Sequence, residues 1–157
     1  KVDDLVEKYV FTSSRLLNNV NSQFKDKIYT IKDIVMAYFS DYEKNKKIHQ
    51  LFVEEVETVL NEKIASLNSK NVIIDWFLLH EMNSFKKMDI KILMILDRNL
   101  RIERVKKRNQ DKDINTFIEV DNFYRENYDC EFDYIFDTSN NNYIEDIKIL
   151  YKRMKIK

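Results

Sequence analysis

The sequence predicts an α/β fold of three layers, in which helices cover both faces of a parallel sheet, in a single domain over residues 1–157. Three short apolar runs, at 71–75, 89–96 and 132–138, have the length of strands and lack polar alternation. Unbroken apolar strands are typical of parallel sheets that are buried on both faces. The other segments carry apolar residues at steps of three and four, which indicates amphipathic helices.

The region before the first run is predicted to be helical. Residues 3–20 have helical spacing with a break near 12–14, and Thr30 and Asp33 stand at the spacing of a capping box, which marks a helix start. Ser40 and Glu43 repeat that signal. The long helix that follows presents one apolar face, made by Ile48, Leu51, Phe52, Val56, Val59, Leu60, Ile64 and Leu67.

The three predicted strands, at 71–75, 90–96 and 132–137, each end on an acidic residue or just before one. These residues are Asp75, Asp97 and Asp137. Ligands of open α/β sheets bind at the carboxyl ends of the strands, so we expect a site there. Two helical segments separate the second strand from the third, and residues 142–154 form a last amphipathic helix.

The composition is that of a folded, charge-balanced protein. Hydrophobic residues make up 44% of the chain, and 27 Lys and Arg balance 27 Asp and Glu. This balance gives no argument for a nucleic-acid partner or an anionic membrane. No apolar run reaches the roughly 20 residues that span a bilayer. The single cysteine, Cys130, fits a reducing compartment, and we expect a cytoplasmic protein.

The chain contains no glycine and no proline. These residues therefore cannot form a glycine-rich loop that cradles phosphates. Turns that need a positive φ angle are expected to use Asn or Asp instead. The chain also begins with Lys1 rather than methionine, so we expect an N-terminal segment upstream of it.

From about residue 30 onward the sequence resembles dephospho-CoA kinase, a P-loop kinase of the nucleoside-monophosphate-kinase type. The resemblance is carried by "YFSD" before the long helix, "NVIIDWFLLHE" at 71–81, Arg104 with Arg108, and "FDYIFDTSNN" at 132–141. Phe77 stands where that family has proline. The family's opening strand, Walker A loop and first helix have no counterpart here, so the expected fold is P-loop-kinase-like without them.

The resemblance implies ATP-dependent phosphorylation of the 3′-hydroxyl of dephospho-CoA, with ATP and Mg²⁺ bound. It assigns catalytic roles to Asp3, Arg104 and Arg108, and a part in nucleotide binding to both arginines and to Asn140. Substrate binding falls to Asp75, Leu78, Leu79 and Glu81. The two arginines lie one helical turn apart, and we expect them on a mobile lid at about 98–125, where planar guanidinium groups suit phosphate oxygens.

Each of these residues also has a structural interpretation. The arginines fit a solvated basic helix face, Asp75 fits a turn or a helix cap, and Asp3 fits a cap as well. Leu78 and Leu79 fit a core. His49 and His80 lie on different elements without a third ligand at metal spacing, so we expect no metal site from them.

Two function classes remain open at this point. One is a kinase whose P-loop lies upstream, in which a missing central strand separates 71–75 from 90–96. The other is a non-catalytic relic or fragment of such a kinase that acts as a binding module. A nucleic-acid-binding helix over 98–108 is the weakest alternative, because acidic residues flank the basic ones. For the 157 residues alone we expect no kinase activity.

Overall fold

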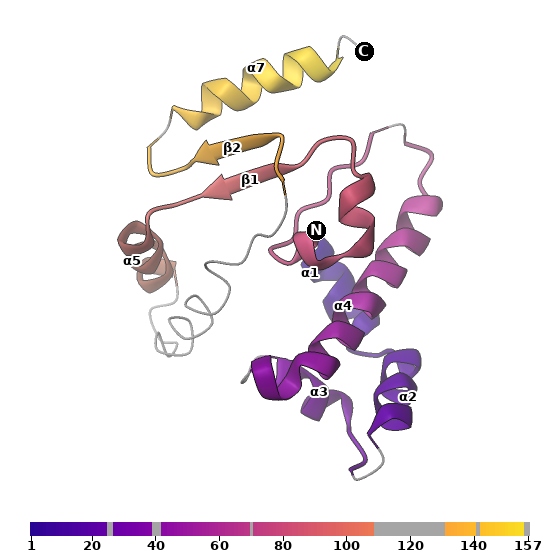
Figure 1. Cartoon of the computed structure of the whole chain (residues 1–157). Helices are drawn as coiled ribbons and strands as arrows, with labels where there is room; N and C mark the ends of the chain where they lie inside the picture. The colour runs from indigo at the N-terminus through magenta and orange to yellow at the C-terminus, as the bar shows by residue number, and fades with distance from the viewer. Residues whose placement is uncertain (25–26, 39–41, 70, 109–130, 141, 156–157) are drawn as a thin grey trace. The chain divides into compact units, whose positions relative to one another are not determined.

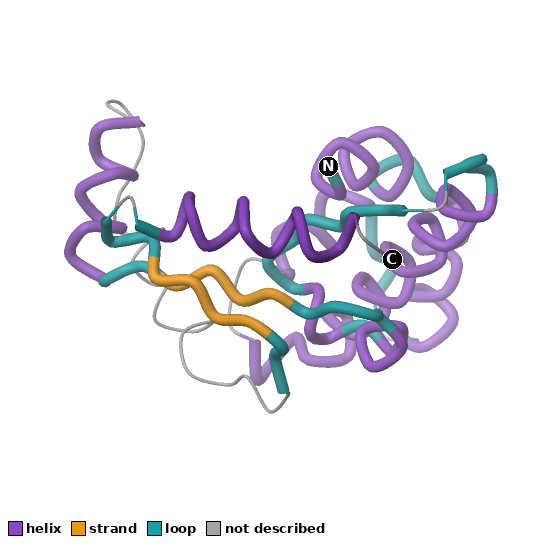
Figure 2. The backbone as a smooth tube through the Cα atoms, turned by 90° about the horizontal axis from the view of Figure 1, so that it is seen from above, coloured by secondary structure: helices purple, strands orange, loops and turns teal. Residues whose placement is uncertain are grey.

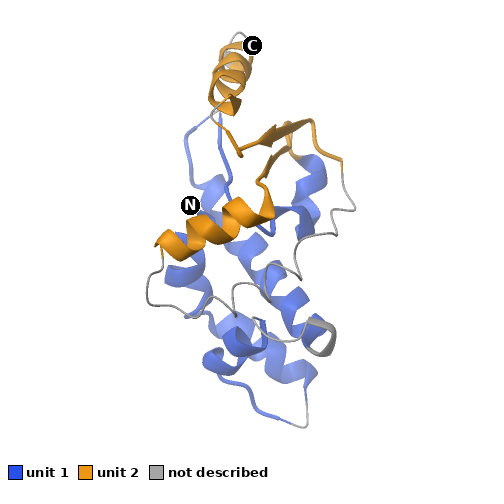
Figure 3. Cartoon of the chain, turned by 90° about the vertical axis from the view of Figure 1, so that its left-hand side faces the viewer, with its two compact units in different colours: residues 1–87 blue, residues 88–157 orange. Residues whose placement is uncertain are grey.

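The computed structural model describes residues 1–24, 27–38, 42–69, 71–108, 131–140 and 142–155. The chain divides into two compact units, Lys1–Lys87 and Met88–Lys157 (Figure 3). The expectation of one domain over 1–157 stays a prediction.

All the secondary structure described in the first unit is helical (Figure 1). A short helix α1 (Val2–Leu5) continues into a π-helical turn η1 (Val6–Val10), and α2 (Ser14–Gln23), α3 (Ile31–Tyr38) and α4 (Tyr42–Ala65) follow. The predicted break near 12–14 is confirmed: Ser13 caps α2, and its Oγ accepts a hydrogen bond from the Leu16 N–H over 3.1 Å. Two 3₁₀ turns, η2 (Leu79–Glu81) and η3 (Asn83–Lys87), end the unit.

The predicted capping box at the start of α3 is confirmed. The Thr30 N–H donates to the Asp33 carboxylate over 2.8 Å, and the Asp33 N–H donates to the Thr30 hydroxyl over 3.2 Å. The corresponding signal at Ser40 lies outside the described residues.

Helix α4 forms the centre of the first unit. Its apolar face is buried at the predicted positions Ile48, Leu51, Phe52, Val56 and Leu60. The α2 and α3 helices pack against it and bury Leu16, Val20, Ile34 and Tyr38. Three polar residues of α4 are buried as well, although the apolar pattern does not predict it: His49, Glu55 and Glu57.

The buried Glu55 of α4 accepts hydrogen bonds from two residues at the start of α2. It is 4% exposed, and its carboxylate accepts hydrogen bonds from the Ser13 hydroxyl at 2.6 Å and from Arg15 Nε at 2.8 Å. Arg15 reaches Glu62 with its Nη1 as well, over 3.1 Å. The hydrogen bonds that Arg15 donates to the carboxylates of Glu55 and Glu62 raise the pKa of Arg15. A buried carboxylate is thereby paired, as burial requires.

The second unit contains two parallel strands, β1 (Ile92–Ile95) and β2 (Tyr134–Asp137), with α5 (Arg98–Arg108) between them and α7 (Tyr143–Lys155) after them. Ile92 pairs with Tyr134 and Ile95 with Asp137. Figure 2 shows the two strands side by side, with a long helix running along them. The predicted strands at 90–96 and 132–137, their parallel direction and the last helix are confirmed. Val105, Phe136 and Leu150 are buried.

The predicted three-layer α/β/α fold is wrong. The described part of the chain is mostly helical, and its sheet has only the two strands β1 and β2. Residues 71–76 form neither helix nor strand, and the Ile73 side chain is 88% exposed. An apolar run becomes a strand only where another strand pairs with its backbone and a layer covers its side chains. Neither holds at 71–75, so a P-loop-kinase-like sheet is not formed.

Two further expectations can be compared with the described residues. No described residue has a positive φ angle. The turns in the described residues therefore do not need Asn or Asp in a left-handed conformation, the substitute for glycine that the sequence led us to consider. Among the same residues, no helix combines the length and the apolar character required to cross a bilayer.

Candidate functional site

The carboxyl ends of β1 and β2 are joined to each other and to α5. Asp97, just after β1, accepts hydrogen bonds through Oδ1 from the N–H groups of Asn99 (2.9 Å) and Leu100 (3.2 Å), so it caps α5. Its own N–H donates to the Ser139 hydroxyl over 3.3 Å. At the strand ends, where a site was expected, the turn after β1 and the turn after β2 are therefore linked by a hydrogen bond.

The turn after β2 has the same construction. Asp137 accepts a hydrogen bond from the Ser139 N–H over 2.8 Å, and the hydrogen bonds from Ser139 lower the pKa of Asp137. The Thr138 N–H and hydroxyl both donate to the Ile95 carbonyl, at 2.8 and 2.9 Å. Asn140 accepts from the Asn142 N–H over 2.9 Å. Asn140, a residue that the resemblance assigns to nucleotide binding, thus lies in this turn.

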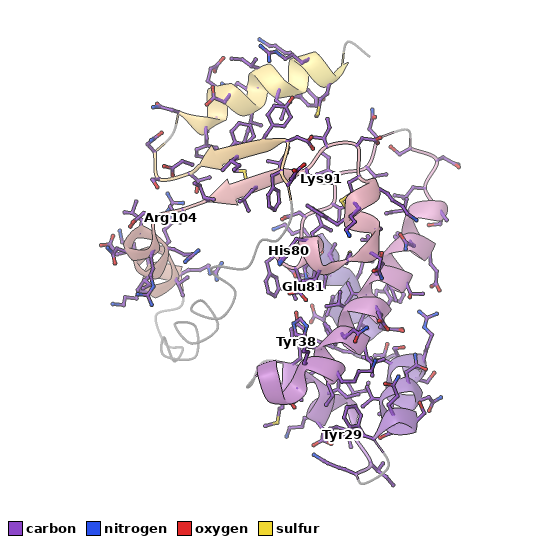
Figure 4. The ribbon with its side chains drawn as sticks, viewed as in Figure 1. Tyr29, Tyr38, His80, Glu81, Lys91 and Arg104 are labelled. Carbon is purple, nitrogen blue, oxygen red and sulfur yellow. The ribbon has the colours of Figure 1, made fainter. Side chains whose placement is uncertain are left out.

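Arg104 reaches the turn from α5. Its Nη2 donates a hydrogen bond to the backbone carbonyl of Thr138 over 3.0 Å, and its side chain is labelled in Figure 4. Arg104 and Arg108 are both exposed on α5. The guanidinium group of Arg104 therefore lies at the carboxyl end of β2. The mobile lid at about 98–125 stays a prediction. Residues 109–125 of that lid lie outside the described residues.

The other predicted site residues belong to the first unit. Asp3 lies exposed on α1, and Asp75 lies exposed one residue before the buried Trp76. Leu78 is fully buried, which supports its structural interpretation as a core residue. Leu79 and Glu81 begin and end the turn η2. Asp75, Leu78, Leu79 and Glu81 thus follow one another along one short segment, while Asp3 lies on a different element.

A cluster around Glu81 went unnoticed in the sequence. Glu81 Oε2 lies 3.4 Å from His49 Nδ1, and its Oε1 lies 3.9 Å from His80 Nε2. His49 is 2% exposed, and the Tyr38 ring stacks on it with centroids 4.7 Å apart and planes 6° apart. Figure 4 labels Tyr38, His80 and Glu81 in the first unit. The one feature of the sequence that could have indicated this cluster is the position of His49 on the apolar face of α4, which predicts a buried imidazole.

Burial shifts the pKa values in this cluster toward the neutral forms. It raises the pKa of Glu81 to about 7 and lowers the pKa of His49 to about 4. Burial also lowers the pKa of His80. A neutral carboxyl group next to a neutral imidazole is therefore the favoured form of the Glu81–His49 pair between pH about 4 and about 7.

Glu57 lies two helical turns further along α4 than His49. It accepts hydrogen bonds from the start of the turn η3. Its Oε1 accepts a hydrogen bond from the Ser84 N–H at 2.6 Å, and its Oε2 accepts from the Asn83 N–H at 3.1 Å and from Asn83 Nδ2 at 3.4 Å. Burial alone would raise the pKa of Glu57, but these hydrogen bonds together outweigh it and lower the pKa. Glu57 is therefore an ionised acceptor at the start of η3.

The Glu81 cluster does not form a metal centre. The two imidazoles face different oxygens of one carboxyl group, so the three side chains do not converge on one point. No group of three His, Cys, Asp or Glu side chains suited to a metal occurs among the residues that the structure describes. Comparison of the chain with family models, with curated proteins and with solved structures found no match.

Proposed function

We propose that the chain binds a phosphorylated nucleotide at the carboxyl ends of β1 and β2, in the manner of the nucleotide-handling part of a dephospho-CoA kinase. The carrying observation is the position of Arg104, whose guanidinium group lies against the Thr138 carbonyl in the turn after β2. Dephospho-CoA and ATP are the proposed ligands, and the cytoplasm is the proposed location.

The chemistry of this edge suits phosphate groups in two respects. A guanidinium group carries five N–H donors, and the hydrogen bond to Thr138 uses one of them, so further donors can bind phosphate oxygens. The last turn of α5 carries three more basic residues, Lys106, Lys107 and Arg108. The turns that hold Asp97 and Asp137 are tied together by hydrogen bonds, so the edge is preorganised for a ligand.

The 157 residues alone bind but do not transfer phosphate in this proposal. A P-loop kinase places the triphosphate on backbone N–H groups of a glycine-rich turn and backs it with a lysine. The chain has no glycine to build that turn. The resemblance implies Mg²⁺ with ATP, and the phosphates of the nucleotide would supply most of its ligands, as is common for Mg²⁺.

The proposal is tested by titrating dephospho-CoA and Mg²⁺–ATP into the chain and measuring the heat of binding. The variant Arg104→Ala is expected to weaken binding at least about tenfold, the effect of losing one charge-assisted contact. Arg153→Ala, the same change on the exposed face of α7, is the matched control and should bind as the parent does. Equal affinity in parent and Arg104→Ala would refute the proposed site.

A further inference from the structure

The segment from Leu78 to Lys87, here called the strap, is attached to α4 by two carboxyl groups in contrasting surroundings. Glu57 on α4 receives the N–H groups of Asn83 and Ser84 from the strap. Glu81 on the strap faces the imidazole of His49 on α4. Leu78, Met82 and Phe85 of the strap are buried, so apolar contacts complete the attachment.

The surroundings of Glu57 require an ionised carboxylate. Three N–H donors point at its two oxygens, and an ionised carboxylate is an acceptor only. A proton on either oxygen would face an N–H donor and remove one of these hydrogen bonds. Glu57 also stands at the start of the turn η3, where the backbone N–H groups favour a negative charge.

The surroundings of Glu81 favour the opposite state. Its partner His49 is almost completely buried and stacked on Tyr38, so a charge on the imidazole would be poorly solvated there. Three quarters of the Glu81 side chain are covered too, which disfavours a carboxylate. A protonated carboxyl group that donates to an unprotonated Nδ1 satisfies both groups without a buried charge.

We propose that the strap is a pH-sensitive attachment, which docks on α4 most tightly when Glu57 is ionised and Glu81 carries a proton that it donates to His49. Among the described residues, the titratable groups that face this attachment are Tyr38 of α3, His49 and Glu57 of α4, and His80 within the strap, while Lys86 and Lys87 stand at its end. This inference does not depend on the proposed nucleotide site.

The alkaline side of the switch follows from the Glu81–His49 pair. The docked pair keeps its shared proton up to pH about 7, whereas the released pair keeps one up to about 6.5, the ordinary value for histidine. Raising the pH through 7 therefore favours release of the strap, because the docked pair holds its proton more tightly than the separated groups do.

Amide hydrogen exchange across the strap provides the test. In the parent chain, the protection of the Asn83, Ser84 and Phe85 amides, corrected for intrinsic rates, should fall threefold or more between pH 6 and pH 8.5. Glu81→Gln should show no such fall; its protection should instead rise by about fourfold over that range, because at pH 6 only the released His49, with an ordinary pKa of about 6.5, takes up a proton. Glu57→Gln should lower protection at least about tenfold at every pH, because it replaces an acceptor by a donor.

Glu54→Gln is the matched control, since Glu54 is an exposed residue of α4 that accepts a hydrogen bond from Gln50 over 2.8 Å. It should reproduce the parent's pH profile. A parent profile without a fall, or a Glu81→Gln profile that falls as the parent's does, would overturn the proposal. The ¹⁵N shifts of His49 in the parent give a second readout that needs no variant: an unprotonated Nδ1 at pH 6 is expected, and a protonated one contradicts the proposal.

Discussion

The Nη2 atom of Arg104 donates a hydrogen bond over 3.0 Å to the backbone carbonyl of Thr138, which links the middle of α5 to the turn after β2. A single exposed hydrogen bond of this kind stabilises a protein by about 0.5–1.5 kcal/mol. Arg104→Ala is therefore expected to leave the second unit folded, as circular dichroism can verify. A loss of ligand binding in this variant can then be assigned to the guanidinium group rather than to unfolding.

Glu57 supports a stability prediction in the first unit. Glu57→Gln should lower the free energy of unfolding by about 1–3 kcal/mol, because one N–H of the strap loses its acceptor in a buried place. Denaturant titration followed by the fluorescence of Trp76, the only tryptophan, measures this change. Glu54→Gln should alter it by less than about 0.5 kcal/mol. Similar losses in both variants would show that Glu57 is not a cap of η3.

Arg15 leads to a second stability prediction. Arg15→Ala leaves Glu55, which is 4% exposed, with the Ser13 hydroxyl but without its charged partner. We expect a loss of about 1–3 kcal/mol from this under-satisfied carboxylate. Glu62→Ala removes only the exposed arm of the network and should cost at most about 1 kcal/mol. If the two variants lose equal stability, Glu55 does not depend on Arg15.

The Glu81–His49 pair predicts an unusual dependence of stability on pH. The folded pKa of Glu81 is raised from 4.5 to about 7, so its contribution to stability falls as the pH rises through that range. The folded pKa of His49 is lowered from 6.5 to about 4, so its contribution rises with pH. Between pH about 4.5 and 6.5 the two slopes oppose each other, and the pair's net contribution is nearly flat.

Glu81→Gln removes one of these slopes. The free energy of unfolding of this variant, relative to the parent, should rise with pH between 4.5 and 6.5, by up to about 1.4 kcal/mol per pH unit. Urea titrations of the two proteins at four pH values in this range measure the difference. Parallel pH profiles would mean that Glu81 does not bind a proton more tightly in the folded state.

The sequence predicted local structure better than it predicted the sheet. The capping box at Thr30 and Asp33, the buried face of α4 and the parallel strands β1 and β2 depend on residues near one another or on strong apolar periods. The run at 71–75 has the same apolar pattern as a buried strand, yet Ile73 is 88% exposed. An apolar run shows that a segment is able to form a strand. Whether it does so depends on a neighbouring strand that can pair with it, and the run itself does not show where that neighbour lies.

The candidate sites show the same limit. Asp97 and Asp137 were expected at strand ends, because those ends can be located from the apolar runs, whereas Asp75 was expected there too but does not follow a strand. The contact between His49 and Glu81 joins residues on different elements, and no spacing rule connects them. Glu57 likewise looked like one of many charged residues on a helix, whereas three N–H donors converge on it in the folded chain.

The most direct test of the proposed function is a calorimetric titration of the 157-residue chain with dephospho-CoA and with Mg²⁺–ATP, paired with an assay for transfer of phosphate between them. We predict saturable binding of at least one of these ligands, weakened about tenfold or more by Arg104→Ala but not by Arg153→Ala, and no turnover near the roughly 1–100 per second of kinases. Absence of binding to both ligands, or binding unaffected by Arg104→Ala, would contradict the proposal of a nucleotide site at the ends of β1 and β2.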